Sequence, residues 1–361
     1  MRKTPFTEIH RAIGAKLVDF AGFEMPVQYS GIIEEHLAVR NRVGVFDVTH
    51  MGEFIVRGKD AAAFLQKMTV NDVSKLFNGR VQYSAMCYDD GGIVDDLLVY
   101  HCGDHYMLVV NASNTQKDFE WLRSHLEGDV ELIDKSLDFS LLAVQGPHSL
   151  LTLKKLTDVD LSNVEYYHFV RGKLAGVDMI ISRTGYTGEL GFELYFPWDD
   201  ALAVKVWNSV FQAGREFGVA PVGLGARDTL RLEMGFCLYG NDIDQTTHPL
   251  EAGLGWITKL SKGDFIGKSV MIQAKKAGLR RKLVGFSLSE KAVARHGYPL
   301  AVNGGAVGHV TSGTFSPSLE RAIGLGYVAS EHADEGTTIH VGIRGKEVPA
   351  TIVKIPFVKK P

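Results

Sequence analysis

Hydrophobic and polar positions alternate in short runs through the middle of the chain, and this pattern predicts β-strands. Three such runs, Val81–Tyr88, Ile93–Tyr100 and Tyr106–Val110, are separated only by Asp89–Gly92 and by Gly103-Asp104. Separators this short connect neighbouring antiparallel strands, so the three runs predict a meander. We expect a further strand at 53–56 and a short helix at 61–68 before the meander, and a helix at about 113–126 after it.

The pattern changes near Gly263. Before this residue, strand-like runs at 139–144, 177–183 and 192–196 alternate with helices predicted near 147–156, 199–217 and 224–235. After it, a Lys-rich helix at 267–277 precedes short strands at 282–288, 306–311, 322–327 and 348–355. Short strands with Gly-rich turns are typical of a small barrel or sandwich. Because no βαβ alternation supports a doubly wound sheet, the predicted class is α+β with a C-terminal all-β part.

Composition narrows the functional classes. A chain of 361 residues is long enough for two or three domains, and its 45% hydrophobic residues can form real cores. A formal net charge of −3 gives no strong field toward nucleic acid or an anionic membrane, so neither is expected as a partner. No segment reads as a signal peptide or a membrane span. We therefore expect a soluble protein of the cytoplasm, or of the mitochondrial matrix if it is a processed organelle form.

Two adjacent aspartates, Asp95 and Asp96, lie within the apolar run that begins at Ile93. Side chains alternate along a strand, so Asp96 would share a face with Leu98 and Tyr100, and Asp95 would face the other side. A carboxylate in a strand interior is costly unless it is paired or has a chemical role. Two interpretations follow: a functional carboxylate on a strand, or an Asp pair that still belongs to the preceding turn.

The segment Arg183–Glu193 has glycines at positions 185, 188 and 191, which predicts a loop whose backbone closely approaches another group. A dinucleotide-binding loop is excluded, because no helix follows and Glu189 would repel a phosphate. Glu193 alternates with Phe192 and Leu194 at the start of a strand. The alternative to a ligand-binding loop is a plain Gly-rich hairpin.

A helix predicted within Gly223–Gly235 carries Arg227 and Arg231 one turn apart. A ligand-binding arginine and a solvent-exposed Arg–Glu lattice both fit this spacing. His101, Cys102 and His105 lie at a strand end and a turn, and no second ligand pair follows at zinc spacing, so we expect no metal.

Taken together and in this order, the motifs resemble the T-protein family of the glycine cleavage system, nearly from end to end. The matching segments are Gly14–Pro26, Gly44–Gly52, Gly91–Asp96, Gln145–Pro147, Arg183–Gly188, Gly223–Glu233, Leu238–Asp242, Thr311–Gly313, Ser316-Pro317 and Pro356-Phe357. One departure is Leu190, where Asp is common in the family; it affects a loop and not the chemistry.

The resemblance implies an α+β, three-domain cloverleaf, with two antiparallel α/β domains around a folate site and a small C-terminal β-barrel. The first domain would combine residues 1–50 with 140–250. The second would span residues 51–139 and carry Asp96, and the third would span residues 264–361.

The resemblance also implies a folate-dependent aminomethyltransferase. An aminomethyl group on the dihydrolipoyl arm of the lipoylated H-protein would give its methylene to tetrahydrofolate, with release of ammonia. Asp96 would be the catalytic carboxylate, which stabilises a cationic methylene–nitrogen species. Glu193 would accept the donor pair of the pterin, and Arg227 would hold a carboxylate. The other folate-binding residues implied are Met51, Tyr83, Val109, Asn111 and Tyr186, together with Asp96 itself.

Two other functions are open. Sarcosine- and dimethylglycine-oxidising enzymes append this module to a large flavin domain, for which 361 residues leave no room, so the chain would be a separate subunit of such an enzyme. Non-catalytic folate-binding proteins of iron–sulfur assembly or RNA modification carry a Lys-Gly-Cys-Tyr motif, and this chain has Arg183–Tyr186 without a Cys.

Carrier H-proteins of this family tend to be acidic, so a basic surface is a candidate for docking. The basic residues that cluster before the barrel and at the end of the chain are Lys275, Lys276, Arg280, Arg281, Lys282, Lys354, Lys359 and Lys360. A solvated basic face with no partner is the alternative.

Overall fold

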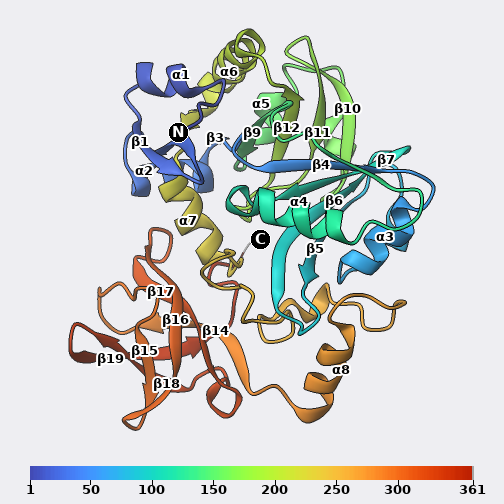
Figure 1. Ribbon diagram of the computed structural model, residues 1–361. Coiled ribbons are helices and arrows are strands. Elements are labelled where there is room, and N and C mark those ends of the chain that lie inside the picture. The colour runs from blue at the N-terminus through green and yellow to red at the C-terminus, as the bar shows by residue number, and fades with distance from the viewer. Residues whose placement is uncertain (360–361) are drawn as a thin grey trace. The chain divides into compact units, whose positions relative to one another are not determined.

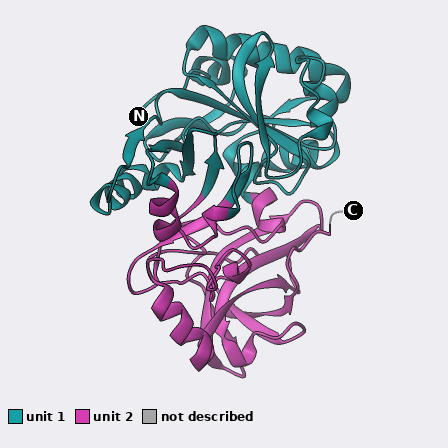
Figure 2. Cartoon of the chain, turned by 90° about the vertical axis from the view of Figure 1, so that its right-hand side faces the viewer, with its two compact units in different colours: residues 1–61, 75–82, 98–228 teal, residues 62–74, 83–97, 229–361 magenta. Residues whose placement is uncertain are grey.

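The computed structural model describes residues 1–359, which form a six-stranded, a five-stranded and a two-stranded sheet with associated helices, and a closed barrel (Figure 1). The chain divides into two compact units (Figure 2). Unit 1 comprises residues 1–61, 75–82 and 98–228; unit 2 comprises residues 62–74, 83–97 and the described chain from 229 onwards. The predicted three-domain division stays a prediction.

A six-stranded sheet forms most of unit 1, in the order β10-β11-β12-β9-β3-β13. Its strands are β3 (Gly44–Asp47), β9 (Phe139–Gln145), β10 (Phe169–Leu174), β11 (Val177–Ser182), β12 (Gly191–Pro197) and β13 (Ala220–Pro221). All neighbours are antiparallel except β13 and β3. The strands predicted at 177–183 and 192–196 pair directly, as β11 and β12.

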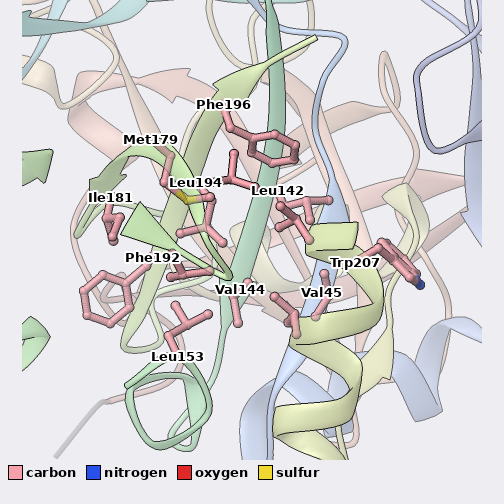
Figure 3. Packing of buried hydrophobic residues seen from close by; sticks show 14 of the residues in the cluster. Val45, Leu142, Val144, Leu153, Met179, Ile181, Phe192, Leu194, Phe196 and Trp207 are labelled. Carbon is pink, nitrogen blue, oxygen red and sulfur yellow. The ribbon is translucent and has the colours of Figure 1, made fainter. Parts of the chain in front are cut away.

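Helices α5 (Ser149–Leu153) and α6 (Asp200–Gly214) pack against this sheet. The Asp199 carboxylate caps α6 by accepting the N–H of Leu202 at 2.8 Å. Because Ala203, Val206 and Trp207 follow the helical period, one face of α6 joins the buried cluster that Figure 3 shows around Val144. Each fully buried side chain of this kind contributes about 1.5–3 kcal/mol, so the cluster holds β9 and β12 rigidly beneath the helices.

The predicted meander is confirmed within a five-stranded sheet of order β5-β6-β7-β4-β8. Its strands are β4 (Gly52–Arg57), β5 (Val81–Cys87), β6 (Ile93–His101), β7 (His105–Val110) and β8 (Glu131–Asp134), with α3 (Ala61–Met68), η2 (Ala112–Asn114) and α4 (Thr115–Ser124) along the same stretch. In register, Leu98 of β6 lies opposite Val109 of β7, and Val109 lies opposite Glu53 of β4. Residues opposite one another share a face of the sheet, so these three side chains point the same way.

The C-terminal part is a closed six-stranded barrel, as the sequence predicts, in the order β14-β17-β16-β15-β18-β19. Its strands are β14 (Arg281–Leu288), β15 (Pro299–Val302), β16 (Gly305–Ser316), β17 (Arg321–Ala329), β18 (Thr338–Ile343) and β19 (Lys346–Val353). The sequence pattern missed β15 and β18. β15 has only four residues, too few to establish an alternation. In β18, Ile339 and Val341 do alternate with polar or small neighbours and are buried, so this strand was predictable from the sequence.

The remaining elements are α1 (Thr7–Ala12), α2 (Ile32–Asn41), α7 (Leu224–Glu233), α8 (Lys268–Ala277) and the hairpin of β1 (Lys16–Phe20) with β2 (Phe23–Gln28). Short 3-10 helices occur at Val73–Lys75, Leu161–Asn163, Arg215–Phe217, Leu254–Trp256 and Ser330–His332. Across residues 1–359, none of the helices has both the length and the apolar character needed to traverse a lipid bilayer.

Candidate active site

Asp95 and Asp96 both lie inside β6, so the interpretation that places them in the preceding turn is wrong. The turn has its own aspartate, because the Asp90 carboxylate accepts the N–H of Gly92 at 3.0 Å. Gly92 is packed tightly there: a Cβ at this position would lie 2.0 Å from the carbonyl oxygen of Gln245. Asp95 is fully buried, whereas Asp96 is half-buried on the opposite side of the strand.

Tyr83 contacts Asp96 directly. Its hydroxyl donates a hydrogen bond of 2.9 Å to Oδ2 of Asp96, and its ring lies 6.0 Å from the ring of Trp256, which is 60% exposed. The thiol of Cys237 is no nucleophile in this neighbourhood, because burial and the charges of Asp242 and Asp96 raise its pKa well above the usual value. Two of the predicted residues, Tyr83 and Asp96, therefore form one group, in unit 2.

Glu193 lies in unit 1 on β12 and is only 8% exposed. The hydroxyl of Thr184 donates to Oε2 of Glu193, and the hydroxyl of Tyr195 lies 3.5 Å from the same oxygen. Tyr100 extends this network, since its hydroxyl lies 3.0 Å from that of Tyr195 and 3.1 Å from Oγ of Ser182. Burial raises the pKa of Glu193, while Thr184 and the nearby charge of Arg227 act in the opposite direction.

Arg227 and Tyr186 complete a second group around Glu193. The guanidinium carbon of Arg227 lies 4.7 Å from the centroid of the Tyr186 ring, a cation–π distance. His50 belongs to the same surroundings, because burial and the charge of Arg227 lower its pKa to about 4, against the opposing charge of Asp47. His50 is therefore neutral at physiological pH. The sequence places His50 in a family-like segment but does not mark it as a site residue.

The backbone of the Gly-rich segment packs closely against the side chain of Gln145. A Cβ at position 185 would lie 2.1 Å from Oε1 of Gln145, and one at 191 would lie 2.5 Å from Cδ of the same side chain. Gln145 in turn donates to the carbonyl oxygen of Thr184 at 3.1 Å and accepts from the Thr187 hydroxyl at 2.9 Å. The glycines thus let Gln145 hold the backbone that carries Thr184, the residue that anchors Glu193.

The second half of α7 is buried, so a solvent-exposed Arg–Glu lattice is the wrong interpretation of this helix. Arg231 is 2% exposed and donates to Asp242 at 2.6 Å and to Ser312 at 2.9 Å. Glu233 is fully buried and accepts hydrogen bonds from the hydroxyls of Ser316 at 2.5 Å and Ser318 at 2.8 Å. These residues fix α7 and are structural.

Three further predicted residues lie on or directly beside β4 and β7. Val109 is buried on β7, on the face that it shares with Leu98 and Glu53. Asn111 follows β7 at the start of η2, and Met51 directly precedes β4; both are half-buried. All three belong to unit 1.

Metal ligands do not gather in the part of the chain that the structure describes: no cluster of three or more His, Cys, Asp or Glu residues there could hold an ion. His105 instead contacts Asp104 at 2.7 Å, and the ring of His101 packs 4.7 Å from that of Tyr106. All three cysteines are buried free thiols whose pKa is raised, in each case first by burial.

Comparisons with known proteins agree along the whole chain. The family model for the GCVT N-terminal domain matches residues 6–262, and that for the glycine cleavage T-protein C-terminal barrel domain matches residues 281–359. An aminomethyltransferase of Halothermothrix orenii is 52% identical over 99% of this chain and 100% of its own length, and one of Chloroherpeton thalassium is 55% identical over 100% and 99%. The crystal structure of glycine cleavage system aminomethyltransferase T from Bartonella henselae superposes with a TM-score of 0.92 at 34% identity, covering 99% of this chain and 98% of that one. The chain therefore belongs to the aminomethyltransferase, or T-protein, family of the glycine cleavage system.

Proposed function

We propose that the chain transfers the methylene carbon of an aminomethyl group from the dihydrolipoyl arm of an H-protein to tetrahydrofolate. The carbon leaves both its sulfur and its nitrogen and becomes bonded to two folate nitrogens. The two protons released from those nitrogens go to the amine, which departs as ammonia, and to the sulfur, which becomes a thiol. Full-length similarity to aminomethyltransferases supports this reaction. A cytoplasmic location stays a prediction.

Glu193 is proposed to bind the pterin, and its anchored carboxylate is the observation that carries the proposal. The hydroxyls of Thr184 and Tyr195 both engage Oε2, so the orientation of the carboxylate is set before a ligand arrives. Each carboxylate oxygen has two lone pairs, which leaves acceptor capacity for a donor pair. The ring N–H and the exocyclic amino group of a pterin form such a pair, side by side.

Arg227, which stacks on Tyr186, is proposed to hold a carboxylate of the folate, because the planar guanidinium group matches the geometry of a carboxylate. Its charge also acts on Glu193, so Arg227 lies close to the proposed pterin-binding residue. Tyr83, Met51, Val109 and Asn111 are proposed as further walls and partners of the ligand.

Asp96 is proposed to carry the chemistry. The transfer passes through a cationic methylene–nitrogen species, and a fixed carboxylate stabilises a positive charge that develops beside it. The hydrogen bond from Tyr83 orients this carboxylate. No protein nucleophile is required, in agreement with three buried thiols of raised pKa.

The H-protein is proposed to dock on the basic cluster that precedes the barrel. Lys275, Lys276, Arg280 and Lys282 are exposed there. Arg281 is a weaker candidate than the sequence indicates, because it bonds Glu251 at 3.2 Å and lies 4.8 Å from the Tyr327 ring. At the end of the chain Lys354 and Lys359 are exposed, and Lys360 lies outside the described residues.

The test is ammonia release from H-protein loaded with the aminomethyl group, with and without tetrahydrofolate, and we expect fast release only with it. Glu193→Gln places one amide donor against a pterin donor and should weaken folate binding by about 1–3 kcal/mol, measured by calorimetry. The control is Glu120→Gln, an exposed residue of α4. Ammonia release at the same rate with and without tetrahydrofolate would refute the proposed function. An unchanged folate affinity of Glu193→Gln would show that Glu193 does not bind the ligand.

A further inference from the structure

A second buried carboxyl group lies close to Glu193. Glu53, on β4, is 1% exposed, and neither of its carboxyl oxygens has a hydrogen-bond partner among residues 1–359. Its backbone is satisfied, because its N–H donates to Oγ of Ser136 at 3.1 Å and its carbonyl accepts the N–H of Lys135 at 2.8 Å. Buried polar groups are nearly always bonded, so a buried carboxyl with two unbonded oxygens points to a missing partner.

Among residues 1–359, the charges that act on Glu53 are those of acidic groups, and no cation compensates them. The negative charges of Asp134 on β8 and Glu193 on β12 act on the Glu53 carboxyl. The charge of Glu53 also acts on the Tyr195 hydroxyl, and the residue opposite Glu53 on β7 is the apolar Val109. Burial, followed by the charges of Asp134 and Glu193, raises the pKa of Glu53 well above its usual value. An unpaired ionised carboxylate is too costly in such a place, so Glu53 keeps its proton and carries an O–H donor.

Glu53 also points toward the surroundings of Glu193. It shares the face of Val109 and Leu98, and Tyr100 lies on that face two residues beyond Leu98. The Tyr100 ring packs 5.7 Å from the ring of Tyr195, whose hydroxyl contacts Glu193. Glu53 and Glu193 both belong to unit 1, and the Tyr100–Tyr195 ring contact joins the two strand faces that carry them.

We propose that Glu53 is a further ligand-binding residue, which donates a hydrogen bond as a neutral carboxylic acid to the pterin carbonyl oxygen. This inference rests on the proposed binding of the pterin by Glu193. One edge of a pterin presents an amino group, a ring N–H and a carbonyl oxygen in sequence, which is two donors followed by an acceptor. An ionised Glu193 beside a protonated Glu53 is complementary to that edge, with two acceptors followed by a donor. Neighbouring carboxyls with opposite protonation states are a known way to divide two roles.

The protonation state makes the inference testable by pH. Once Glu53 ionises, it can no longer donate a hydrogen bond, and its carboxylate faces the ligand carbonyl as a second acceptor. The dissociation constant for tetrahydrofolate should therefore rise about tenfold per pH unit above the pKa of Glu53. Glu53→Gln keeps a donor that cannot ionise, so its affinity should stay near the wild-type value at neutral pH and lack this alkaline loss. Glu53→Leu removes the donor and should bind about 3–10-fold more weakly already at neutral pH.

A second variant changes the pKa of Glu53 without touching the residue. Asp134 raises the pKa of Glu53, so Asp134→Asn should move the alkaline loss of binding to lower pH. Calorimetric titrations of all variants from neutral to alkaline pH, with Glu120→Gln as the control, measure both effects. An infrared carbonyl band of a protonated carboxylic acid, absent from Glu53→Gln, reports the neutral state directly.

Stability gives a readout independent of folate. When the pKa of a carboxyl group is higher in the folded state than in the unfolded state, the group stabilises the fold fully at a pH below the unfolded-state pKa. This stabilisation is lost as the pH rises toward the folded-state pKa. Glu53→Gln should therefore melt above the wild type, by a margin that grows as the pH rises above the ordinary Glu range.

The outcomes separate the two proposals. Equal alkaline loss in the wild type and Glu53→Gln, or wild-type affinity in Glu53→Leu, would overturn the role of Glu53 and leave Glu193 standing. If Glu193→Gln binds tetrahydrofolate with wild-type affinity, Glu193 does not bind the pterin, and the proposal on which this inference rests is refuted. If Glu53→Gln fails to fold, an unshifted pH profile in Asp134→Asn overturns the inference.

Discussion

Asp95 and Asp96 are consecutive on β6, yet their surroundings differ at the scale of single atoms. Asp95 is completely buried on one side of the strand, while Asp96 on the other is half-buried and accepts the Tyr83 hydroxyl. A half-buried, oriented carboxylate can face a cation that forms during a reaction, whereas a fully buried one serves the fold. The two residues therefore answer differently to the same substitution.

Asp96→Asn is nearly isosteric and removes only the charge. We expect folded structure and folate affinity to be retained, while single-turnover ammonia release slows about 100-fold or more. Asp95→Asn is the matched control and should lower the melting temperature more than the turnover. If Asp95→Asn is the slower enzyme at an equal folded fraction, the assignment of faces to functions is wrong.

At the scale of elements, α7 combines two roles on one short helix. Arg227 near its start stacks on Tyr186, and Arg231 one turn later is buried against Asp242. Asp242 is held as well by the Thr311 hydroxyl at 2.5 Å. The buried end of α7 therefore fixes the helix that presents Arg227.

Arg231→Met tests that role. Removing one partner of a buried ion pair leaves the other charge uncompensated, so the free energy of unfolding should fall by about 3–5 kcal/mol in denaturant titrations. The exposed residue Arg123 of α4 provides the control, since Arg123→Met should change stability by less than about 0.5 kcal/mol. A loss for Arg231→Met no larger than that of the control would contradict the structural role of the pair.

The sequence predicts elements with a regular local pattern and misses features that depend on distant segments. Alternation from Ile93 to Tyr100 locates β6 and separates its two aspartates. The spacing of Arg227 and Arg231 fits a surface lattice equally well, because nothing local reveals that Asp242 and Ser312 cover the second arginine. Nothing in the sequence around Glu53 indicates that its side chain is buried, because that burial depends on strands from three parts of the chain.

The same limit applies to function. Alternation and spacing single out Asp96, Glu193 and Arg227 as candidates, but only the family resemblance supplies the reaction and a role for each of them. The network that anchors Glu193 follows from alternation only in part: Tyr195 is two residues along the same strand, but Tyr100 approaches from another sheet.

At the scale of the whole molecule, a formal net charge of −3 conceals a local excess of positive charge at the end of α8 and the start of β14. Such a patch accelerates encounter with an acidic partner through its local field, even when the total charge is small. This electrostatic attraction affects the association with H-protein and not the binding of folate. Measuring the KM for H-protein and the folate dissociation constant side by side therefore separates the two.

Raising the ionic strength from about 0.1 M to about 1 M shortens the Debye length from about 10 Å to about 3 Å. The apparent KM for H-protein should then rise while the folate dissociation constant barely changes. Replacing Lys275 and Lys276 together by Gln should reduce this salt dependence, and Lys346→Gln, an exposed barrel residue, should not. A KM that ignores salt would exclude electrostatic docking on this surface.

The position of β3 in its sheet has a consequence during synthesis of the chain. β3 pairs with β9 on one side and β13 on the other, yet Asp47 precedes Phe139 by about ninety residues. At roughly 5–20 residues per second, the ribosome leaves this apolar strand without either neighbour for several seconds. A nascent chain paused in that interval exposes an unpaired strand to other chains. The yield of folded protein should therefore depend on chaperones that hold the nascent N-terminal segment until β9 emerges.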